Sequence, residues 1–231
     1  MVSEKKDSNK RYERKCRVEN TNRHQVWHLI KHHPAFFKAI YQPRQINNIY
    51  FDSLQFKYYK ANEIGIANRK KVRIRWYGPI ANIAKQPQLE IKIKNGLVGD
   101  KLVYPLPAFS LTNKFTPQFF VDLAATYQVP KTILEELRSL RPTLFNTYQR
   151  SYFQSVDKNF RLTFDEDMMF YRPNFLSNQQ LKGKQTIGSF IIELKYQLAH
   201  DPLARKIFQQ FPYRLTKNSK YVNGIDLLQL N

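Results

Sequence analysis

Alternation of basic and apolar side chains along residues 69–77 constrains the fold of this chain more than any other feature. Successive side chains of a β-strand point to opposite faces, so a strand here would have one basic and one apolar face. The basic face would carry Arg69, Lys71, Arg73 and Arg75. The apolar face would carry Val72, Ile74 and Trp76. A strand of this kind lies between a hydrophobic core and a charged surface.

The same alternation recurs at residues 11–19, 89–94 and 191–195, where carboxylates stand among the cations. In each stretch a glutamate precedes a lysine by two residues, as in Glu13 and Lys15, Glu90 and Lys92, Glu193 and Lys195. One such strand is typical of a solvated surface. Four of them predict an enclosed basic surface that holds a few carboxylates among its cations.

The charge balance predicts a polyanionic partner. The formal net charge is +20, from 38 Lys and Arg against 18 Asp and Glu. Such a charge suits nucleic acid, a phosphate-rich small molecule or an anionic membrane. We expect no specific nucleic acid, because the cations lie on strand faces with interleaved glutamates rather than in a loop or helix cluster.

Compartment and membrane signals point to a soluble cytoplasmic protein. A lone cysteine, Cys16, excludes an intramolecular disulfide and fits a reducing compartment. No apolar run approaches the ~20 residues that span a bilayer. Residues 1–10 are polar and charged, without the apolar core of a secretory signal. We expect no transmembrane segment, and a membrane partner, if one exists, is not encoded here.

Sequence patterns predict one domain over residues 11–231, preceded by a flexible charged tail at 1–10. Strands are expected at about 11–19, 46–52, 69–78, 88–94, 97–104, 143–155, 159–165 and 187–196. Helices are expected at about 22–32, 53–62, 116–140 with a break at Pro130, 201–211 and 217–229. The Asn95-Gly96 pair predicts a hairpin turn between two of the strands.

These elements favour an α+β fold built around a closed antiparallel barrel. The helices carry apolar stripes that need a surface, which places the apolar strand faces outside, beneath them, and the charged faces inside. An open sheet with its polar face in solvent is the alternative. Burying many like charges is costly unless water or a counter-ligand compensates, so a hydrated tunnel that receives a polyanion satisfies the pattern.

A set of short motifs then resembles a known family, the vacuolar transporter chaperone (VTC) domain, which belongs to the triphosphate tunnel metalloenzymes. The resemblance covers about residues 11–228. Its motifs, in chain order, are Glu13-x-Lys15, Tyr50-Phe51-Asp52, Arg73-x-Arg75, Glu90-x-Lys92, Tyr148-x-Arg150, Arg161-x-Thr163-x-Asp165, Glu193-x-Lys195 and Ser219-Lys220-Tyr221.

The resemblance implies a closed eight-stranded antiparallel barrel with helices packed outside, and an ATP-dependent polyphosphate polymerase. Such an enzyme transfers the γ-phosphoryl of ATP to a growing polyphosphate chain, so the implied partners are ATP and polyphosphate or other polyanionic phosphates. The implied phosphate-binding and catalytic residues are Lys15, Arg73, Arg75, Lys92, Arg150, Arg161, Lys195 and Lys220. The implied cofactor is Mn²⁺ or Mg²⁺, with Glu193 as its ligand and Glu13 and Glu90 as further candidates.

Phosphoryl-transfer chemistry agrees with this set, because it needs positioning and charge neutralisation rather than a nucleophilic side chain. A hard divalent cation also prefers carboxylate and water ligands. One departure is Arg11, which stands where other tunnel enzymes often place a second carboxylate, so fewer protein-held metal positions are expected. Each glutamate could instead only orient a neighbouring cation. A tripolyphosphatase or nucleoside triphosphatase of the same fold, and a non-catalytic polyphosphate- or inositol-phosphate-binding module, remain alternative functions.

Overall fold

The computed structural model describes residues 11–80, 83–95, 98–112, 115–173 and 183–230. The expected tail at 1–10 lies outside these ranges, as does Gly96 of the expected hairpin turn. The described residues form six α-helices and a large antiparallel sheet, so the α+β class is confirmed.

Eight strands follow one another across the main sheet, in the order β1-β11-β9-β8-β2-β3-β5-β6. They are β1 (Arg11–Val18), β2 (Lys38–Asp52), β3 (Asn68–Tyr77), β5 (Gln88–Asn95), β6 (Val98–Pro105), β8 (Arg141–Gln154), β9 (Arg161–Tyr171) and β11 (Phe190–Gln197). The short β10 (Lys184–Gln185) pairs with β9, while β4 (Ile83–Ala84) and β7 (Phe109–Ser110) form a separate pair. All eight strands expected from the sequence correspond to strands of this order.

Hydrogen bonds among the described strands do not close the sheet, because its order begins at β1 and ends at β6. A closed barrel is therefore not confirmed. The outer edge of β1 is partly covered by the segment after residue 212. Thr216 donates its N–H to the carbonyl of Lys15 at 2.9 Å, and its hydroxyl accepts from the N–H of Arg17 at 3.0 Å.

Two compact units divide the chain. Unit 1 comprises the described residues of Met1–Pro43, Arg150–Glu166 and Ile187–Asn218. Unit 2 comprises those of Arg44–Gln149, Asp167–Thr186 and Ser219–Asn231. Strands β2, β8 and β9 contribute residues to both units. Each unit has its own hydrophobic core, and each is described here by itself.

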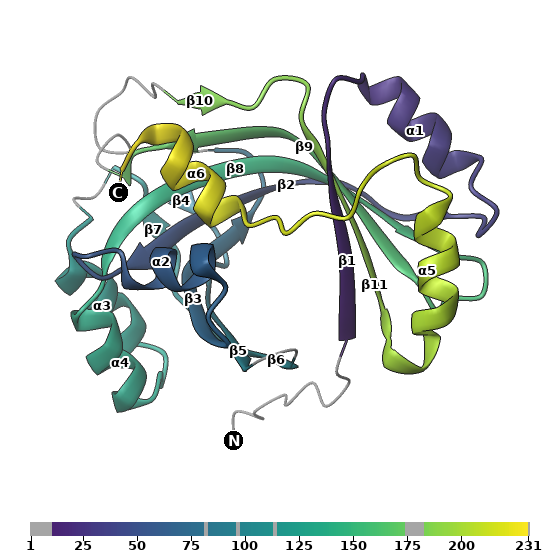
Figure 1. The fold of residues 1–231 in the computed structure, drawn as a ribbon. Helices are drawn as coiled ribbons and strands as arrows, with labels where there is room; N and C mark the ends of the chain where they lie inside the picture. Colours follow the sequence, from purple (N-terminus) through teal and green to yellow (C-terminus); the bar gives the residue numbers. More distant parts are fainter. Residues whose placement is uncertain (1–10, 81–82, 96–97, 113–114, 174–182, 231) are drawn as a thin grey trace. The chain divides into compact units, whose positions relative to one another are not determined.

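In unit 1, helices α1 (Arg23–Lys31) and α5 (Asp201–Gln209) pack on one face of the strands (Figure 1). A 3₁₀ turn, η2 (Leu198–His200), precedes α5. Asn22 caps α1, accepting from the N–H of Gln25, whose side chain accepts in return from the N–H of Asn22. The core joins strand and helix residues that include Cys16, Leu162, Phe164, Ile192, Leu194, Val26, Ile30, Ala204 and Ile207.

In unit 2, helices α3 (Pro117–Ala125) and α4 (Lys131–Arg138) contribute to the core, and Pro130 separates them as expected. Trp76 stacks on Phe145 at the centre of this core, with ring centroids 5.7 Å apart. Two further helices, α2 (Lys57–Ile64) and α6 (Lys220–Leu228), are joined through Asp52. Its carboxylate accepts from the N–H groups of Tyr58 and Tyr59 and from the hydroxyl of Tyr221.

Both units thus place their apolar strand faces beneath helices, as the sequence predicts. Val72, Ile74 and Trp76 belong to the unit 2 core, and the intervening arginines lie on the opposite face of β3. Cys16 and Val18 belong to the unit 1 core, with Lys15 between the core side chains of β1. The candidate site residues lie on the opposite, charged face of the strands in each unit.

Candidate functional site

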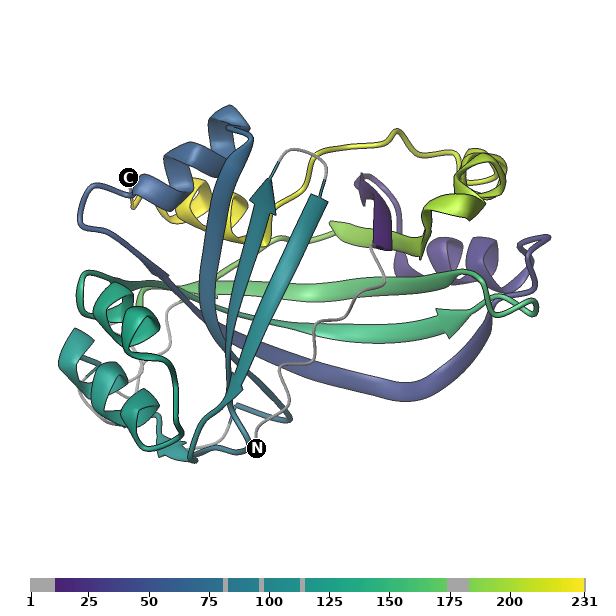
Figure 2. The ribbon, with the colours of Figure 1, turned by 90° about the horizontal axis from the view of Figure 1, so that it is seen from below.

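A cationic face lies on the side of the unit 2 sheet opposite the Trp76–Phe145 core, and we call it the unit 2 cationic face. Figure 2 shows three of its strands, β3, β5 and β6, side by side. Its residues are Asn48, Tyr50, Arg73, Arg75, Glu90, Lys92, Lys101, Asn146 and Tyr148. Four of these, Arg73, Arg75, Lys92 and Glu90, are among the predicted site residues.

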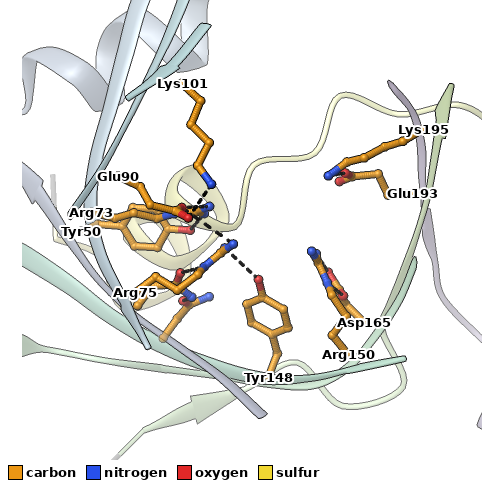
Figure 3. Close-up of polar contacts among 12 residues, drawn as sticks. Tyr50, Arg73, Arg75, Glu90, Lys101, Tyr148, Arg150, Asp165, Glu193 and Lys195 are labelled. Carbon is orange, nitrogen blue, oxygen red and sulfur yellow. Dashed lines mark hydrogen bonds and ion pairs between the residues drawn. The ribbon is translucent and has the colours of Figure 1, made fainter. Parts of the chain in front are cut away.

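Glu90 is the anionic centre of this face and is 3% exposed. Its Oε2 accepts from Nε and Nη2 of Arg73 at 2.7 and 2.5 Å and lies 3.8 Å from Nη1 of Arg75. Its Oε1 lies 2.6 Å from Nζ of Lys101 (Figure 3). Burial alone would raise the pKa of Glu90, but the three cations outweigh it and hold the pKa well below its ordinary value. Glu90 thus contacts three cations at once, which is the arrangement expected of a carboxylate that orients neighbouring cations.

Arg73 and Arg75 of β3 have fixed orientations. Arg73 also donates to the hydroxyl of Tyr50 at 3.3 Å. Arg75 is 8% exposed and donates to Oδ1 of Asn48 at 2.8 Å and to the hydroxyl of Tyr148 at 3.2 Å. Planar guanidinium groups held in this way present their remaining N–H donors in defined directions, which suits recognition of phosphate oxygens.

Three lysines stand in register across β3, β5 and β6. Lys71 is opposite Lys92, and Lys92 is opposite Lys101. Like charges directly opposite one another destabilise a sheet, and an anionic ligand would relieve that repulsion. Sequence reasoning selected Lys92, which is exposed, but missed Lys101, because Val103 interrupts the charge pattern of β6. The hairpin register was the signal that could have found it.

Lys220, another predicted residue, begins α6 and contacts this face. Its Nζ lies 4.5 Å from the ring centroid of Tyr148, a cation–π distance. Nearby on β8, Asn146 is fully buried and accepts from Nδ2 of Asn48 at 2.9 Å. The Nδ2 of Asn146 itself has no hydrogen-bond partner within the described ranges. A buried amide donor of this kind is costly unless a ligand or water satisfies it.

A second cationic face lies on unit 1, opposite the core that contains Cys16, and we call it the unit 1 cationic face. Its residues are Glu13, Lys15, Arg150, Arg161, Thr163, Asp165, Glu193 and Lys195. Glu193 of β11 is 6% exposed and lies between Lys15 and Lys195, the second of which is drawn beside it in Figure 3. Its Oε2 is 3.0 Å from Nζ of Lys15 and its Oε1 is 2.8 Å from Nζ of Lys195. Burial would raise the pKa of Glu193, but Lys195, Lys15 and Arg150 lower it well below its ordinary value.

Lys15 joins the two carboxylates of this face, because its Nζ also lies 2.9 Å from Oε1 of Glu13. Burial would lower the pKa of Lys15, but Glu193 and Glu13 outweigh it and raise the pKa above its ordinary value. Lys15 is therefore fully protonated at neutral pH. The predicted Glu-x-Lys motifs of β1 and β11 thus meet in one ion-pair cluster, with Lys15 directly opposite Glu193 in the register.

Arg150 and Arg161 differ in their surroundings. Arg150 forms a bidentate pair with the fully buried Asp165, with Nε–Oδ1 and Nη2–Oδ2 distances of 2.5 and 2.7 Å. Arg161 is exposed and stands opposite Lys195 in the register. Thr163, between Arg161 and Asp165 on β9, is opposite Glu193 in the register. Its buried hydroxyl has no hydrogen-bond partner in the part of the chain that the structure describes.

The donor sets of the two faces differ in their fit to a divalent cation. Among the described residues, no three His, Cys, Asp or Glu side chains gather into a metal-binding group. Mg²⁺ is commonly held by one or two carboxylates, with substrate phosphates and waters as its other ligands. Glu193 and Glu13 both contact Lys15 and supply two carboxylates for that mode, in which a bound cation would take the place of a lysine ammonium at Glu193. Glu90 fits that mode less well, because two arginines as well as Lys101 contact its carboxylate oxygens.

No helix in the described part of the chain has the length and apolar character needed to cross a membrane.

Comparison with known proteins identifies the family. The VTC domain model matches residues 10–229. No curated protein sequence matches this chain. Many solved structures match this chain, including three whose alignments cover nearly all of both chains.

One is HpAC1 from Hippeastrum, a candidate adenylyl cyclase with a dominant triphosphatase activity. It is 14% identical with a TM-score of 0.52, and the alignment covers 94% of this chain and 95% of HpAC1. The second is a candidate adenylate cyclase from Bacillus halodurans, at 14% identity and TM-score 0.52, aligned over 93% of this chain and 97% of that one. The third is a protein from Pyrococcus horikoshii OT3, at 13% identity and TM-score 0.51, aligned over 94% of this chain and 99% of that one. Identity at this level shows the fold alone. The family model, in contrast, spans almost the whole sequence with its ordered motifs, and the chain belongs to the VTC domain family.

Proposed function

We propose that this protein is an ATP-dependent polyphosphate polymerase, which transfers the γ-phosphoryl of ATP to a growing polyphosphate chain. The observation that carries the proposal is the set of arginines and lysines held in fixed orientations on the two cationic faces of a VTC domain. Carboxylates and tyrosine hydroxyls hold these cations, so little reorganisation is needed when a polyphosphate binds. Preorganised charge of this kind is the main catalytic contribution available in phosphoryl transfer.

Each predicted residue has a role in this proposal. Arg73 and Arg75 would donate forked hydrogen bonds to phosphate oxygens, and the lysines would neutralise charge along the chain. The proposed phosphate-binding set is Lys15, Arg73, Arg75, Lys92, Arg150, Arg161, Lys195 and Lys220, and we add Lys101 to it because it contacts Glu90 beside Arg73. Because none of these groups is a nucleophile, the terminal phosphate of the acceptor chain would itself attack the γ-phosphorus.

Mn²⁺ or Mg²⁺ is the proposed cofactor. Glu193 would hold it, with Glu13 as the second carboxylate. When bound, such an ion would neutralise negative charge that develops on the phosphates during transfer. The lysines beside Glu193 keep that carboxylate ionised, which is the form that a hard cation binds.

Two further expectations belong to the proposal. The sheet would close into the eight-stranded barrel that the family resemblance implies, with the helices outside. The protein would act in the cytoplasm, where the lone Cys16 is compatible with reducing conditions. Its thiol is fully buried, and burial raises its pKa to about 12, so it has no role in catalysis.

Incubation of the pure protein with ATP and Mn²⁺ tests the proposal. Phosphorus NMR and gel electrophoresis should show ADP together with internal phosphates of growing chains. Arg75→Ala should lose both synthesis and polyphosphate binding, because it removes a charge-assisted contact to phosphate. Exposed Arg138 on α4, outside both cationic faces, provides a matched control, and Arg138→Ala should leave synthesis unchanged. ADP and orthophosphate without chain growth would contradict a polymerase.

A triphosphatase is the second candidate, favoured by the shared fold with HpAC1, whose dominant activity is that of a triphosphatase. In this case the same experiment would release orthophosphate from ATP or tripolyphosphate and leave no chain. A non-catalytic polyphosphate- or inositol-phosphate-binding module would bind such anions tightly and turn over none.

A further inference from the structure

The start of helix α6 contacts the unit 2 cationic face through three consecutive residues. Ser219 caps the helix, accepting from the N–H of Val222, and its hydroxyl also accepts from Nζ of Lys71 at 2.8 Å. The next two residues, Lys220 and Tyr221, each contact a different tyrosine of the sheet. Those two tyrosines are the ones whose hydroxyls hold Arg73 and Arg75.

The first connection runs from Tyr221 through Tyr50 to Arg73. The rings of Tyr221 and Tyr50 stack with centroids 5.1 Å apart and an interplanar angle of 22°. The guanidinium of Arg73 lies 5.9 Å from the centroid of the Tyr50 ring and donates to its hydroxyl. Tyr221 is 1% exposed and is anchored by its own hydroxyl, which donates to Oδ2 of Asp52 at 2.6 Å.

The second connection runs from Lys220 through Tyr148 to Arg75. The ammonium of Lys220 lies over the ring of Tyr148, and the hydroxyl of Tyr148 accepts from Nη2 of Arg75 at 3.2 Å. Tyr148 is 2% exposed, so its ring has little freedom to move independently of its neighbours. Adjacent residues of one helical turn therefore reach two arginines through two separate tyrosines.

We propose that the first turn of α6 positions Arg73 and Arg75, so that the affinity of the unit 2 cationic face for phosphate chains depends on the docking of this helix. Tyr221 and Tyr50 act as positioning residues: Tyr221 fixes the Tyr50 ring, and Tyr50 fixes the guanidinium plane of Arg73. A guanidinium that loses this support keeps its charge but no longer presents its donors in one direction. This inference rests on the proposed function, because it concerns the same anion site.

A double-mutant cycle between Tyr221 and Arg73 tests the coupling, with the Kd of tripolyphosphate measured by calorimetry at low salt. Tyr221→Leu removes the stack on Tyr50 and should weaken binding by about tenfold, the effect of losing one well-directed hydrogen bond to a charged group. In the Arg73→Ala background the same change should have little effect, because the group that Tyr221 positions is gone. Tyr221→Phe keeps the ring and should retain most of the affinity.

Phe120→Leu provides the matched control. Phe120 is 1% exposed and packs edge to face with Phe51, the neighbour of Tyr50 on β2, with centroids 4.8 Å apart. Phe120→Leu should lower the melting temperature about as much as Tyr221→Leu does. It should leave the Kd unchanged, because Phe120 packs against the face of β2 opposite Tyr50.

The outcomes separate the two proposals. Equal losses of affinity from Tyr221→Leu with and without Arg73, or an unchanged Kd in Tyr221→Leu, would overturn the positioning role and leave the proposed function standing. Failure of the wild-type protein to bind tripolyphosphate would overturn both. If Tyr221→Leu does not fold, Tyr50→Leu provides the same cycle from the middle of the connection, with the same expected non-additivity.

Discussion

At the scale of single residues, the two cationic faces hold their charges differently. On unit 2, one carboxylate, Glu90, is shared by Arg73, Arg75 and Lys101. On unit 1, Glu193 lies between Lys15 and Lys195. Arginine forks fix directions, whereas lysine supplies a mobile point charge, so Arg73 and Arg75 are suited to orient phosphate oxygens and the lysines beside Glu193 to neutralise charge.

The role of Glu193 leads to a first prediction. Glu193→Gln should reduce metal-dependent phosphoryl transfer by orders of magnitude, because a neutral amide is a poorer ligand than a carboxylate for a hard cation. Metal-free affinity for polyphosphate should stay within a few-fold of wild type or increase, since a negative charge has been removed. Turnover with Mn²⁺ and calorimetric binding without it measure the two effects separately. Full metal-dependent synthesis by the variant would show that Glu193 is only an ion-pair partner.

Glu90 gives a prediction about pH. Its pKa is lower in the folded protein than in an unfolded chain, where a glutamate titrates near ~4.3. The ionised carboxylate therefore stabilises the fold above that pH, and the contribution is lost as the pH falls through the folded-state pKa.

Glu90→Gln should accordingly be less stable than wild type at neutral pH, by about 1–3 kcal/mol, because Arg73, Arg75 and Lys101 lose their charged partner. The difference in melting temperature between the two proteins should shrink below about pH 4. Thermal melts across this range at constant ionic strength measure it. Other carboxylates titrate in both proteins, so a difference that does not change with pH would mean that the charge of Glu90 contributes nothing.

At the scale of elements, alternation was sufficient to predict the strands and the face on which each charge lies. The helices covering the opposite faces were also predicted, from their apolar stripes and from the break at Pro130. The start of β2 was wrong: the strand begins at Lys38, whereas the sequence indicated about residue 46. Residues 38–45 are largely exposed and include Pro43, so no apolar face marks them as a strand.

Contacts between side chains of distant strands could not be read from the sequence. The shared use of Glu90 depends on the β3–β5–β6 register, and the pairing of Arg150 with Asp165 depends on a side-chain geometry that spacing does not encode. Asp165 is the first of three consecutive acidic residues, and its full burial within β9 is not evident from that run. Separation into two compact units likewise follows from where the two cores form, and no linker composition marks it.

Gly224, within α6, provides a prediction at this scale. In an exposed helix, Gly→Ala usually stabilises by about 1 kcal/mol. Here a Cβ would lie 2.5 Å from Cδ2 of Leu144 and 2.6 Å from Cδ1 of Phe170, both of which are fully or almost fully buried. Gly224→Ala should therefore destabilise the protein by roughly 1–3 kcal/mol, as overpacking does.

Urea denaturation measures this change, and Asn223→Ala on the same helix is the control. Asn223 is only partly buried and alanine is the better helix former, so that variant should be as stable as wild type or more so. A stabilised Gly224→Ala protein would mean that α6 does not pack against Leu144 and Phe170 as described.

At the scale of the whole molecule, the charge of +20 sets the conditions for stability and binding. Self-repulsion among excess cations destabilises a compact state, and part of this repulsion is concentrated where lysines face lysines across β3, β5 and β6. A bound polyanion removes it. Ligand affinity and fold stability are therefore linked, and a phosphate chain should act on both.

Tripolyphosphate should accordingly raise the melting temperature at constant ionic strength. A ligand at ~100 times its dissociation constant adds about 2.7 kcal/mol to the free energy of unfolding, which for a chain of this size corresponds to a shift of about 5–10 °C. Sodium chloride at matched ionic strength should give much less, because chloride screens the cations without bridging several of them at once. The Arg73→Ala, Arg75→Ala double variant should lose most of the shift, whereas Arg138→Ala should keep it. Equal melting temperatures with and without millimolar tripolyphosphate would contradict a phosphate site on either face.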